Sequence, residues 1–479
     1  MHCSALRALT GYEFSVISAT LQPASDSAPE FCRVTGQIPP EIQFEVALPY
    51  QWHKRLLMIG NGGYAGENLE SPGRKATRDQ AVKSGFVFTQ TNTGHDAAEE
   101  PLGTFAVNRQ KLLDYAFRAV HVTAETAKRI AAAYYGTAPA RSYFMGCSTG
   151  GRQALISAQR FPQDFDGIIA GAPVLDFVGT MMNYVSIQQA MAAAPVPPAK
   201  LKLAGEIAYR LCDADDGVKD GVIDDPRRCA FKPSTHLPLC SGRDAPDCFT
   251  PAQIRTLETI YSDQRIQGKR VFPGWPVGAE AVGANGDIGW QGWLVRDDGR
   301  PPTFVVFSEA FFRYLAEPKK NPDLQLSQLD FERNPPNLDW IRQVLNATDT
   351  DLSAFRDRGG KLIMWFGWAD PALNPMMGVE YYESVLRTMG SGTRDFFRLY
   401  MMPGVFHCSG GVGCDASSRL AALIQWVEEG KAPDRIVAMK IVHGKAVRTR
   451  PLCPYPEVAR YKGTGSVDDA ENFVCSVPK

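Results

Sequence analysis

The pentapeptide GCSTG at residues 146–150 leaves few choices for the fold around it, and it reads as G-x-S-x-G with Ser148 at its centre. The run RSYFMG before it is typical of a strand, and residues 151–161 after it have the spacing of a helix. A serine on a sharp turn between a strand and a helix is a nucleophile elbow, in which glycines leave room for the turn and the hydroxyl is exposed. The motif therefore predicts a nucleophilic serine; the alternative is a Gly-rich turn with an inert one.

A histidine far downstream has the same kind of neighbour as this serine. Ser148 follows Cys147, and His407 precedes Cys408. A serine needs a nearby imidazole to take its proton before it attacks a carbonyl. Because a disulfide holds its Cα atoms about 4.4–6.8 Å apart, a Cys147–Cys408 bond would bring Ser148 and His407 within hydrogen-bonding reach. This bond is a hypothesis for how the two residues meet.

Apolar runs alternate with helical segments on both sides of the serine, which implies a mostly parallel sheet with both faces covered. Between about residues 175 and 354 this rhythm is lost, and the chain is rich in Pro, Gly, Trp and Asp. We therefore predict an α/β domain, 1–174 and 355–479, with an inserted lid domain, 175–354. Strands are predicted at 55–60, 85–91, 141–146, 166–170, 359–367 and 396–402, and helices at 112–135, 151–161 and 419–429.

The order of a Ser–acid–His triad in such a fold selects the other two members. His407 lies in a Gly-rich loop after a predicted strand, whereas His443 lies in a basic stretch typical of a solvated edge. We therefore predict His407 as the base. Asp370, just beyond another predicted strand, would hold the imidazole tautomer and stabilise the imidazolium. Its alternative role is a helix cap, since it precedes a proline.

Two backbone N–H groups are expected to form an oxyanion hole. Thr149, the residue after the nucleophile, supplies one. The second is expected from the glycine-rich loop at 60–66, with Gly63 as the first choice and Gly62 as the second. A plain turn is the alternative function of these glycines.

Six aspartates fall within residues 213–225, in a loop bent by glycines. Carboxylate and carbonyl oxygens suit calcium, and Asp213, Asp216 and Asp220 are the candidate side-chain ligands. The D-x-D-x-D-G register of an EF-hand is missing. The metal would be structural, because a serine mechanism does not need it. A solvated acidic loop is the alternative.

Eleven cysteines favour an oxidising compartment. A secreted or periplasmic protein is therefore expected, with its export signal absent from this sequence; buried thiols in a cytosolic protein are the alternative. A net charge of −1 gives no basic field to attract nucleic acid or membrane, and no apolar stretch is long enough to span a membrane. Cys414 remains unpaired when the cysteines are coupled as Cys3–Cys32, Cys147–Cys408, Cys212–Cys229, Cys240–Cys248 and Cys453–Cys475.

Five segments together resemble the tannase and feruloyl esterase family: GNGGYAG, GCSTGG, CDADDGVKDGVIDD, GWADP and PGVFHCSGG. The resemblance implies an α/β-hydrolase fold with a lid inserted after the strand that follows the nucleophile. It also implies a Cys147–Cys408 disulfide beside the serine and histidine. A Ca²⁺ site is implied at Asp213, Asp216 and Asp220, completed by the backbone oxygens of Val218 and Val222.

These features predict a serine carboxylic ester hydrolase that cleaves a small aromatic acyl ester, free or attached to plant polysaccharide, through an acyl-enzyme. Feruloyl and other hydroxycinnamoyl esters are the first expectation, with gallate esters and terephthalate monoesters as alternatives. Acyl transfer to an alcohol and noncatalytic binding of polyphenol or carbohydrate are the remaining alternatives. Four lid aromatics are candidates for stacking on the acyl group, or for building the core of the lid: Trp290, Trp293, Phe311 and Phe312.

Overall fold

The computed structural model describes residues 1–280, 283–287, 289–317 and 320–478, and a nine-stranded mixed sheet lies at its centre. The strand order is β1-β2-β3-β5-β4-β6-β7-β10-β11. Strands from β5 to β11 in this order pair in parallel, whereas β1, β2, β3 and β5 pair antiparallel. The strands are β1 (Ser15–Gln22), β2 (Phe31–Ile38), β3 (Ile42–Pro49), β4 (Arg55–Ile59), β5 (Phe86–Thr91), β6 (Arg141–Cys147), β7 (Gly167–Gly171), β10 (Lys361–Gly367) and β11 (Phe397–Met402).

Both faces of the parallel strands are buried, because successive side chains of a strand point to opposite faces. In β10, Leu362, Met364 and Phe366 enter one core, and Ile363 and Trp365 enter the other. Helices α3 (Ala119–Tyr135), α4 (Thr149–Arg160) and α13 (Met376–Met389) contact the sheet on the first side. Helices α1 (Pro72–Lys83) and α14 (Arg419–Glu429) supply the second core. This is the layering of an α/β-hydrolase.

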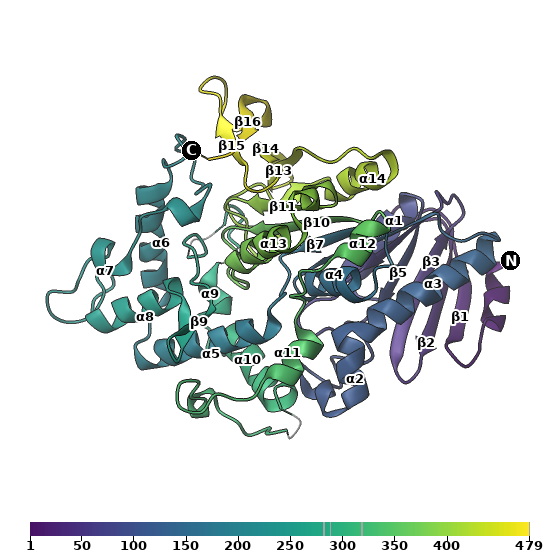
Figure 1. The fold of residues 1–479 in the computed structure, drawn as a ribbon, viewed down its shortest axis with the longest axis horizontal. Coiled ribbons are helices and arrows are strands. Elements are labelled where there is room, and N and C mark those ends of the chain that lie inside the picture. The colour runs from purple at the N-terminus through teal and green to yellow at the C-terminus, as the bar shows by residue number, and fades with distance from the viewer. Residues whose placement is uncertain (281–282, 288, 318–319, 479) are drawn as a thin grey trace.

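In the segment between β7 and β10, in which the lid is predicted, most of the regular elements are helices (Figure 1). Most of its helices gather at one end of the molecule, the last two lie nearer the middle, and the N-terminal strands β1 and β2 lie at the other end. Side chains such as Phe304 and Leu315 of this segment belong to the same continuous core as Leu56 and Phe144 of the sheet. Its elements are α5 (Phe177–Ala193), α6 (Pro198–Cys212), α7 (Pro233–His236), α8 (Pro251–Tyr261), β8 (Gln264–Ile266), β9 (Lys269–Phe272), α9 (Trp290–Trp293), α10 (Thr303–Ala310), a π-helical turn (Phe311–Leu315), α11 (Asp339–Leu345) and α12 (Ser353–Asp357).

The remaining elements lie between β5 and β6 and towards the C-terminus. Between β5 and β6, α2 (Arg109–Leu113) runs into α3 through a π-helical turn at Asp114–Arg118. Short antiparallel strands flank and follow α14. One sheet contains β12 (Ala416–Ser417), which precedes α14, with β13 (Ile436–Val442) and β14 (Lys445–Leu452), which follow it. Another contains β15 (Val458–Tyr461) and β16 (Phe473–Ser476). In the part of the chain described, no helix is both long and apolar enough to cross a membrane.

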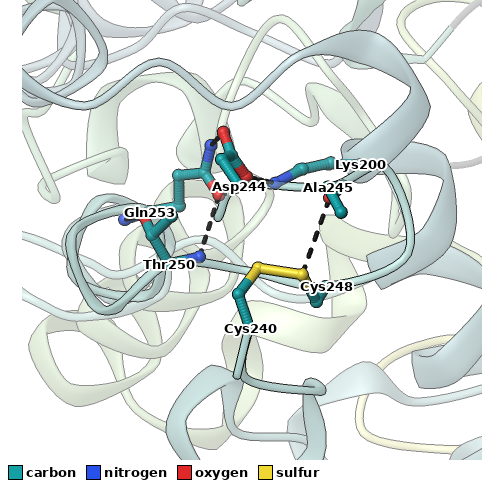
Figure 2. Close-up of a disulfide and its surroundings, with 7 residues drawn as sticks. All are labelled: Lys200, Cys240, Asp244, Ala245, Cys248, Thr250 and Gln253. Atoms are coloured by element: carbon teal, nitrogen blue, oxygen red, sulfur yellow. Dashed lines mark hydrogen bonds and ion pairs between the residues drawn. A yellow bond between two sulfur atoms is a disulfide. The ribbon is translucent and has the colours of Figure 1, made fainter. Parts of the chain in front are cut away.

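Five disulfides are present in the structure, and they join the pairs expected from the sequence. Cys414 is buried as a free thiol. The Cys240–Cys248 bond closes a short loop that carries Asp244, the ion-pair partner of Lys200 on α6 (Figure 2). The ammonium group of Lys200 also donates to the side-chain oxygen of Gln253 at 2.8 Å. The loop therefore provides a counter-charge for a lysine that is only 3% exposed.

Candidate active site

Ser148 lies on the turn between β6 and α4, with φ 64° and ψ −122°. These torsions are strained for a residue with a side chain. Glycine is required on both sides of the turn. A Cβ on Gly146 would lie 2.5 Å from the carbonyl carbon of Gly150, and a Cβ on Gly151 would lie 2.3 Å from the carbonyl oxygen of Gly171. The backbone N–H of Ser148 donates to the same Gly171 oxygen at 2.9 Å, which fixes the turn against β7.

Asp370 and His407 are hydrogen-bonded just beyond the ends of neighbouring strands β10 and β11. Nδ1 of His407 lies 2.8 Å from Oδ2 of Asp370, whose residue is 1% exposed. The other carboxylate oxygen, Oδ1, accepts the backbone N–H groups of Ala372 at 2.8 Å and Leu373 at 2.9 Å. Asp370 therefore both caps the following turn and orients the imidazole. His443 is exposed in the turn between β13 and β14.

The Cys147–Cys408 disulfide joins the end of β6 to the loop after β11, with a Cα–Cα distance of 5.9 Å. It links residues 261 positions apart in the sequence. Ser148 and His407 line the same cavity, next to the two bonded cysteines. The bond therefore connects the nucleophile turn covalently to the loop of the base.

This cavity has a volume of about 400 Å³, and its wall is mostly apolar. It lies between the C-terminal ends of the central strands and the inserted segment, as expected for a site in an α/β sheet. The ring of Trp293 packs edge-to-face against His407, with centroids 5.5 Å apart. The side chains that line it, apart from Ser148, Thr149 and His407, are Asn61, Tyr64, Cys147, Val174, Phe177, Met181, Tyr184, Trp293, Phe307, Ala372, Leu373 and Cys408.

The backbone of the glycine-rich loop distinguishes the two candidate oxyanion donors. The N–H of Gly62 donates to Oε1 of Glu67 at 2.7 Å, so it is already engaged. The N–H of Gly63 has no acceptor among the described residues, and Gly63 lines the cavity. Thr149 also lines it, and as the first residue of α4 it has no intrahelical acceptor for its N–H. Gly63 and Thr149 are therefore the available pair.

Of the four lid aromatics that were candidates either for stacking on the acyl group or for the core of the lid, only Trp293 lines the cavity. Trp290, Phe311 and Phe312 are at most 5% exposed and lie in the continuous core instead. The main apolar wall was not predicted from the sequence; Phe177, Met181 and Tyr184 of α5 provide it. Their i, i+4, i+7 spacing on one helix face is the signal that would have found them.

The acidic loop does not bring its predicted ligands together as a metal site in this structure. Oδ1 of Asp213 accepts the backbone N–H groups of residues 220–222, the shortest at 2.8 Å. Asp220 pairs with Arg450 at 2.5 Å. Within the described ranges, no three His, Cys, Asp or Glu side chains are arranged to hold a metal ion. Asp216 and Asp220, with Val222 and Asp224, nevertheless line one very small cavity.

Burial raises the pKa of Asp216 to about 6. Burial, followed by the charge of Asp216, raises the pKa of Asp224 to about 7. The loop thus concentrates carboxylate oxygens, which are the donors that a hard cation prefers, beside Arg448 and Arg450.

Known proteins that are similar to this chain in sequence and fold include several esterases. A profile of the tannase and feruloyl esterase family matches residues 27–476. The chain is 35% identical to an uncharacterized esterase of Xanthomonas campestris over 99% of this chain and 91% of that protein. It is 32% identical to the mono(2-hydroxyethyl) terephthalate hydrolase of Piscinibacter sakaiensis, over 95% of this chain and 87% of that protein. Feruloyl esterase B from Aspergillus oryzae superposes with a TM-score of 0.87 at 26% identity, over 99% of both chains. The chain belongs to the tannase and feruloyl esterase family of carboxylic ester hydrolases.

Proposed function

We propose that Ser148, His407 and Asp370 hydrolyse esters of neutral aromatic acids, with feruloyl and related hydroxycinnamoyl esters as the preferred class. The observation that carries the proposal is one apolar cavity that holds the strained serine and the Asp370-oriented histidine. Its wall suits a flat ring, because aromatic and aliphatic side chains surround the position next to the serine.

The chemistry follows from the placement of the groups. Nε2 of His407 takes the proton of Ser148 as Oγ attacks the ester carbonyl carbon, while Asp370 stabilises the imidazolium through Nδ1. The N–H groups of Gly63 and Thr149 donate to the oxyanion of the tetrahedral intermediate. His407 then gives the proton to the leaving alkoxide, and the C–O bond breaks. Water, activated by the same imidazole, attacks the acyl-Ser148 ester and releases the acid.

The charge of the wall favours a neutral acyl group. Among the described lining residues there is no lysine or arginine. A free carboxylate on the substrate ring would enter without a cationic partner, and an unpaired buried charge is costly. The hydroxyls of Tyr64 and Tyr184 donate to the carbonyl oxygens of Phe307 and Ala372, so neither is free to donate to a trihydroxylated ring. These contacts favour feruloyl esters over gallate esters and terephthalate monoesters.

The test compares substrates that share one scissile methyl ester and one ring but differ in charge. Dimethyl terephthalate and monomethyl terephthalate share one ring, but only the second carries a carboxylate. The diester should have a kcat/KM at least about tenfold higher, since a stranded charge costs more than one hydrogen bond. Methyl ferulate should exceed methyl gallate, and Ser148→Ala should abolish turnover of all four. Equal rates on the diester and the monoester would contradict the acyl preference, whereas activity in Ser148→Ala would contradict the nucleophile.

We also propose that the acidic loop binds structural Ca²⁺ through the side chains of Asp213, Asp216 and Asp220 and the backbone oxygens of Val218 and Val222. The grouping of buried carboxylates supports this, although Asp213 and Asp220 would have to exchange their present partners. A chelator should lower the melting temperature by several degrees, and added Ca²⁺ should restore it. An unchanged melting temperature in excess chelator would contradict the site.

A location outside the cytoplasm is proposed on the five disulfides, because such bonds persist in oxidising compartments. An extracellular enzyme of this kind would meet aromatic esters attached to plant polysaccharide. Recovery of activity in the culture medium or periplasmic extract of the source cells, rather than in the cytosol, is the corresponding measurement.

A further inference from the structure

A buried tyrosine outside the cavity holds the loop that presents the oxyanion donor. The hydroxyl of Tyr115 donates to the carbonyl oxygen of Gly63 at 3.1 Å. The hydroxyl of Thr149 donates to the same oxygen at 2.5 Å. Two hydroxyls from separate elements therefore fix one carbonyl group, in a residue whose φ of 49° is in the left-handed region.

Tyr115 is itself held by an unusual local structure. It lies in the π-helical turn at Asp114–Arg118, where the regular i→i+4 bonding of the helix is interrupted. Arg152 of α4 donates to the carbonyl oxygens of Tyr115 at 3.3 Å and Ala116 at 3.0 Å. Its guanidinium also lies 4.9 Å from the centroid of the Tyr115 ring. Because α4 begins at the nucleophile turn, this contact ties the tyrosine to the same helix that carries the turn.

The ring of Tyr115 is 1% exposed and does not line the cavity, so it does not contact the substrate. Its effect on the reaction must act through Gly63. The peptide groups on either side of Gly63 share its Cα, so fixing the carbonyl limits rotation of the N–H that faces the oxyanion. Oxyanion donors are effective only when their orientation is set in advance.

We propose that Tyr115 is a positioning residue for the oxyanion hole, and that the π-helical turn serves to aim its hydroxyl at Gly63. This inference rests on the proposed role of Gly63, and it predicts a defect confined to the transition state. Loosening one of two supports should cost less than the hundred- to thousandfold loss that follows removal of an oxyanion donor itself.

The test compares Tyr115→Phe with Tyr381→Phe. Tyr381 is a matched control because it is 4% exposed and its hydroxyl also donates to a backbone carbonyl oxygen, that of Asp349, at 2.8 Å. It differs from Tyr115 in that it does not contact the glycine-rich loop, and it does not line the cavity. With 4-nitrophenyl acetate, Tyr115→Phe should lower kcat about tenfold with KM changed by less than about twofold, as expected for an interaction strengthened only in the transition state. Inhibition by phenylboronic acid, which forms a tetrahedral adduct on the serine, should weaken by the same factor.

Tyr381→Phe should leave kcat and the boronate inhibition at the wild-type level, and the two variants should have similar melting temperatures. A wild-type kcat in Tyr115→Phe, or a loss equal to that of Tyr381→Phe, would overturn the proposal. The short acetyl ester keeps the test independent of the acyl preference. A wild-type enzyme without turnover would instead refute the proposed function.

Discussion

Removal of the Cys147–Cys408 disulfide is predicted to affect stability and catalysis together. The perturbation is the double substitution Cys147→Ala with Cys408→Ala. In the chain-entropy description, the stabilisation by a disulfide grows with the logarithm of the loop that it closes. A separation of 261 residues gives about 5.5 kcal/mol at 25 °C, against about 3.5 kcal/mol for the Cys453–Cys475 bond, whose separation is 22 residues.

The catalytic effect arises because the bond joins the turn of Ser148 to the loop of His407. A displacement of about 1 Å between reacting groups costs about a hundredfold in rate. Without the bond, His407 keeps its hydrogen bond with Asp370, but the nucleophile turn is no longer tethered to the loop of His407. We therefore expect kcat to fall by a factor between about ten and about one hundred, and KM to change less.

The assay is urea unfolding followed by tryptophan fluorescence, together with steady-state hydrolysis of 4-nitrophenyl acetate. The control is Cys453→Ala with Cys475→Ala, which removes the bond between the residue after β14 and β16, and neither cysteine lines the cavity. The control should lose stability but keep kcat. If the Cys147 and Cys408 variant lost no more stability than the control and kept kcat, both the entropic argument and the tethering argument would be refuted.

Two further predictions concern single residues. Asp370→Asn should lower kcat about ten-thousandfold, because Asn favours the wrong imidazole tautomer. It should cost little stability, because Asn retains an oxygen for the backbone amides. Steady-state rates measure kcat and melting curves measure stability, and near-normal turnover would exclude Asp370 from the triad. Burial lowers the pKa of His95, whose ring stacks on Phe105, to about 4. Because this folded-state pKa lies below the unfolded value, the neutral ring contributes stability that is present above about pH 6.5 and lost as the pH falls towards 4, by up to about 3 kcal/mol. His95→Gln should therefore flatten the decline of the unfolding free energy between pH 7 and pH 4, whereas the exposed control His443→Gln should not. If the wild type and both variants gave parallel pH profiles, this pH dependence would not come from His95.

The parallel core of the sheet was predictable because each of its strands is buried on both faces and forms a continuous apolar run. The runs at 55–60, 141–146 and 359–367 correspond to β4, β6 and β10, within about two residues at each end. The predicted helix 419–429 is α14.

The antiparallel strands β1, β2 and β3 were not predicted. A bulge between Val16 and Ser18 shifts the register of β1, which breaks the alternation of apolar and polar residues that identifies a half-buried strand. The predicted helix 112–135 is divided in the structure by the π-helical turn at Asp114–Arg118. The side chain of Arg152, which donates to carbonyl oxygens of this turn, is distant in sequence, so no local pattern contains that contact.

The active site likewise has a part that was predictable from the sequence and a part that was not. Motif, chain order and turn chemistry pointed to Ser148, Asp370 and His407, because each follows a strand of the same sheet. The acyl wall depends on which face of α5 meets the sheet, and this is decided by packing rather than by composition. For that reason Trp290 and Phe311 could not be distinguished from Trp293 by residue type alone.

The bond between Cys147 and Cys408 turns the intervening chain into a covalent ring that contains the whole segment between β7 and β10. A protease that cuts an exposed loop of this segment would open the ring without releasing either piece, since the two polypeptides remain joined through sulfur. Nicked enzyme would migrate as one species until it is reduced, with its nucleophile and base still attached to each other. Chain breaks and loop replacements in the inserted segment should therefore leave Ser148 and His407 attached to each other.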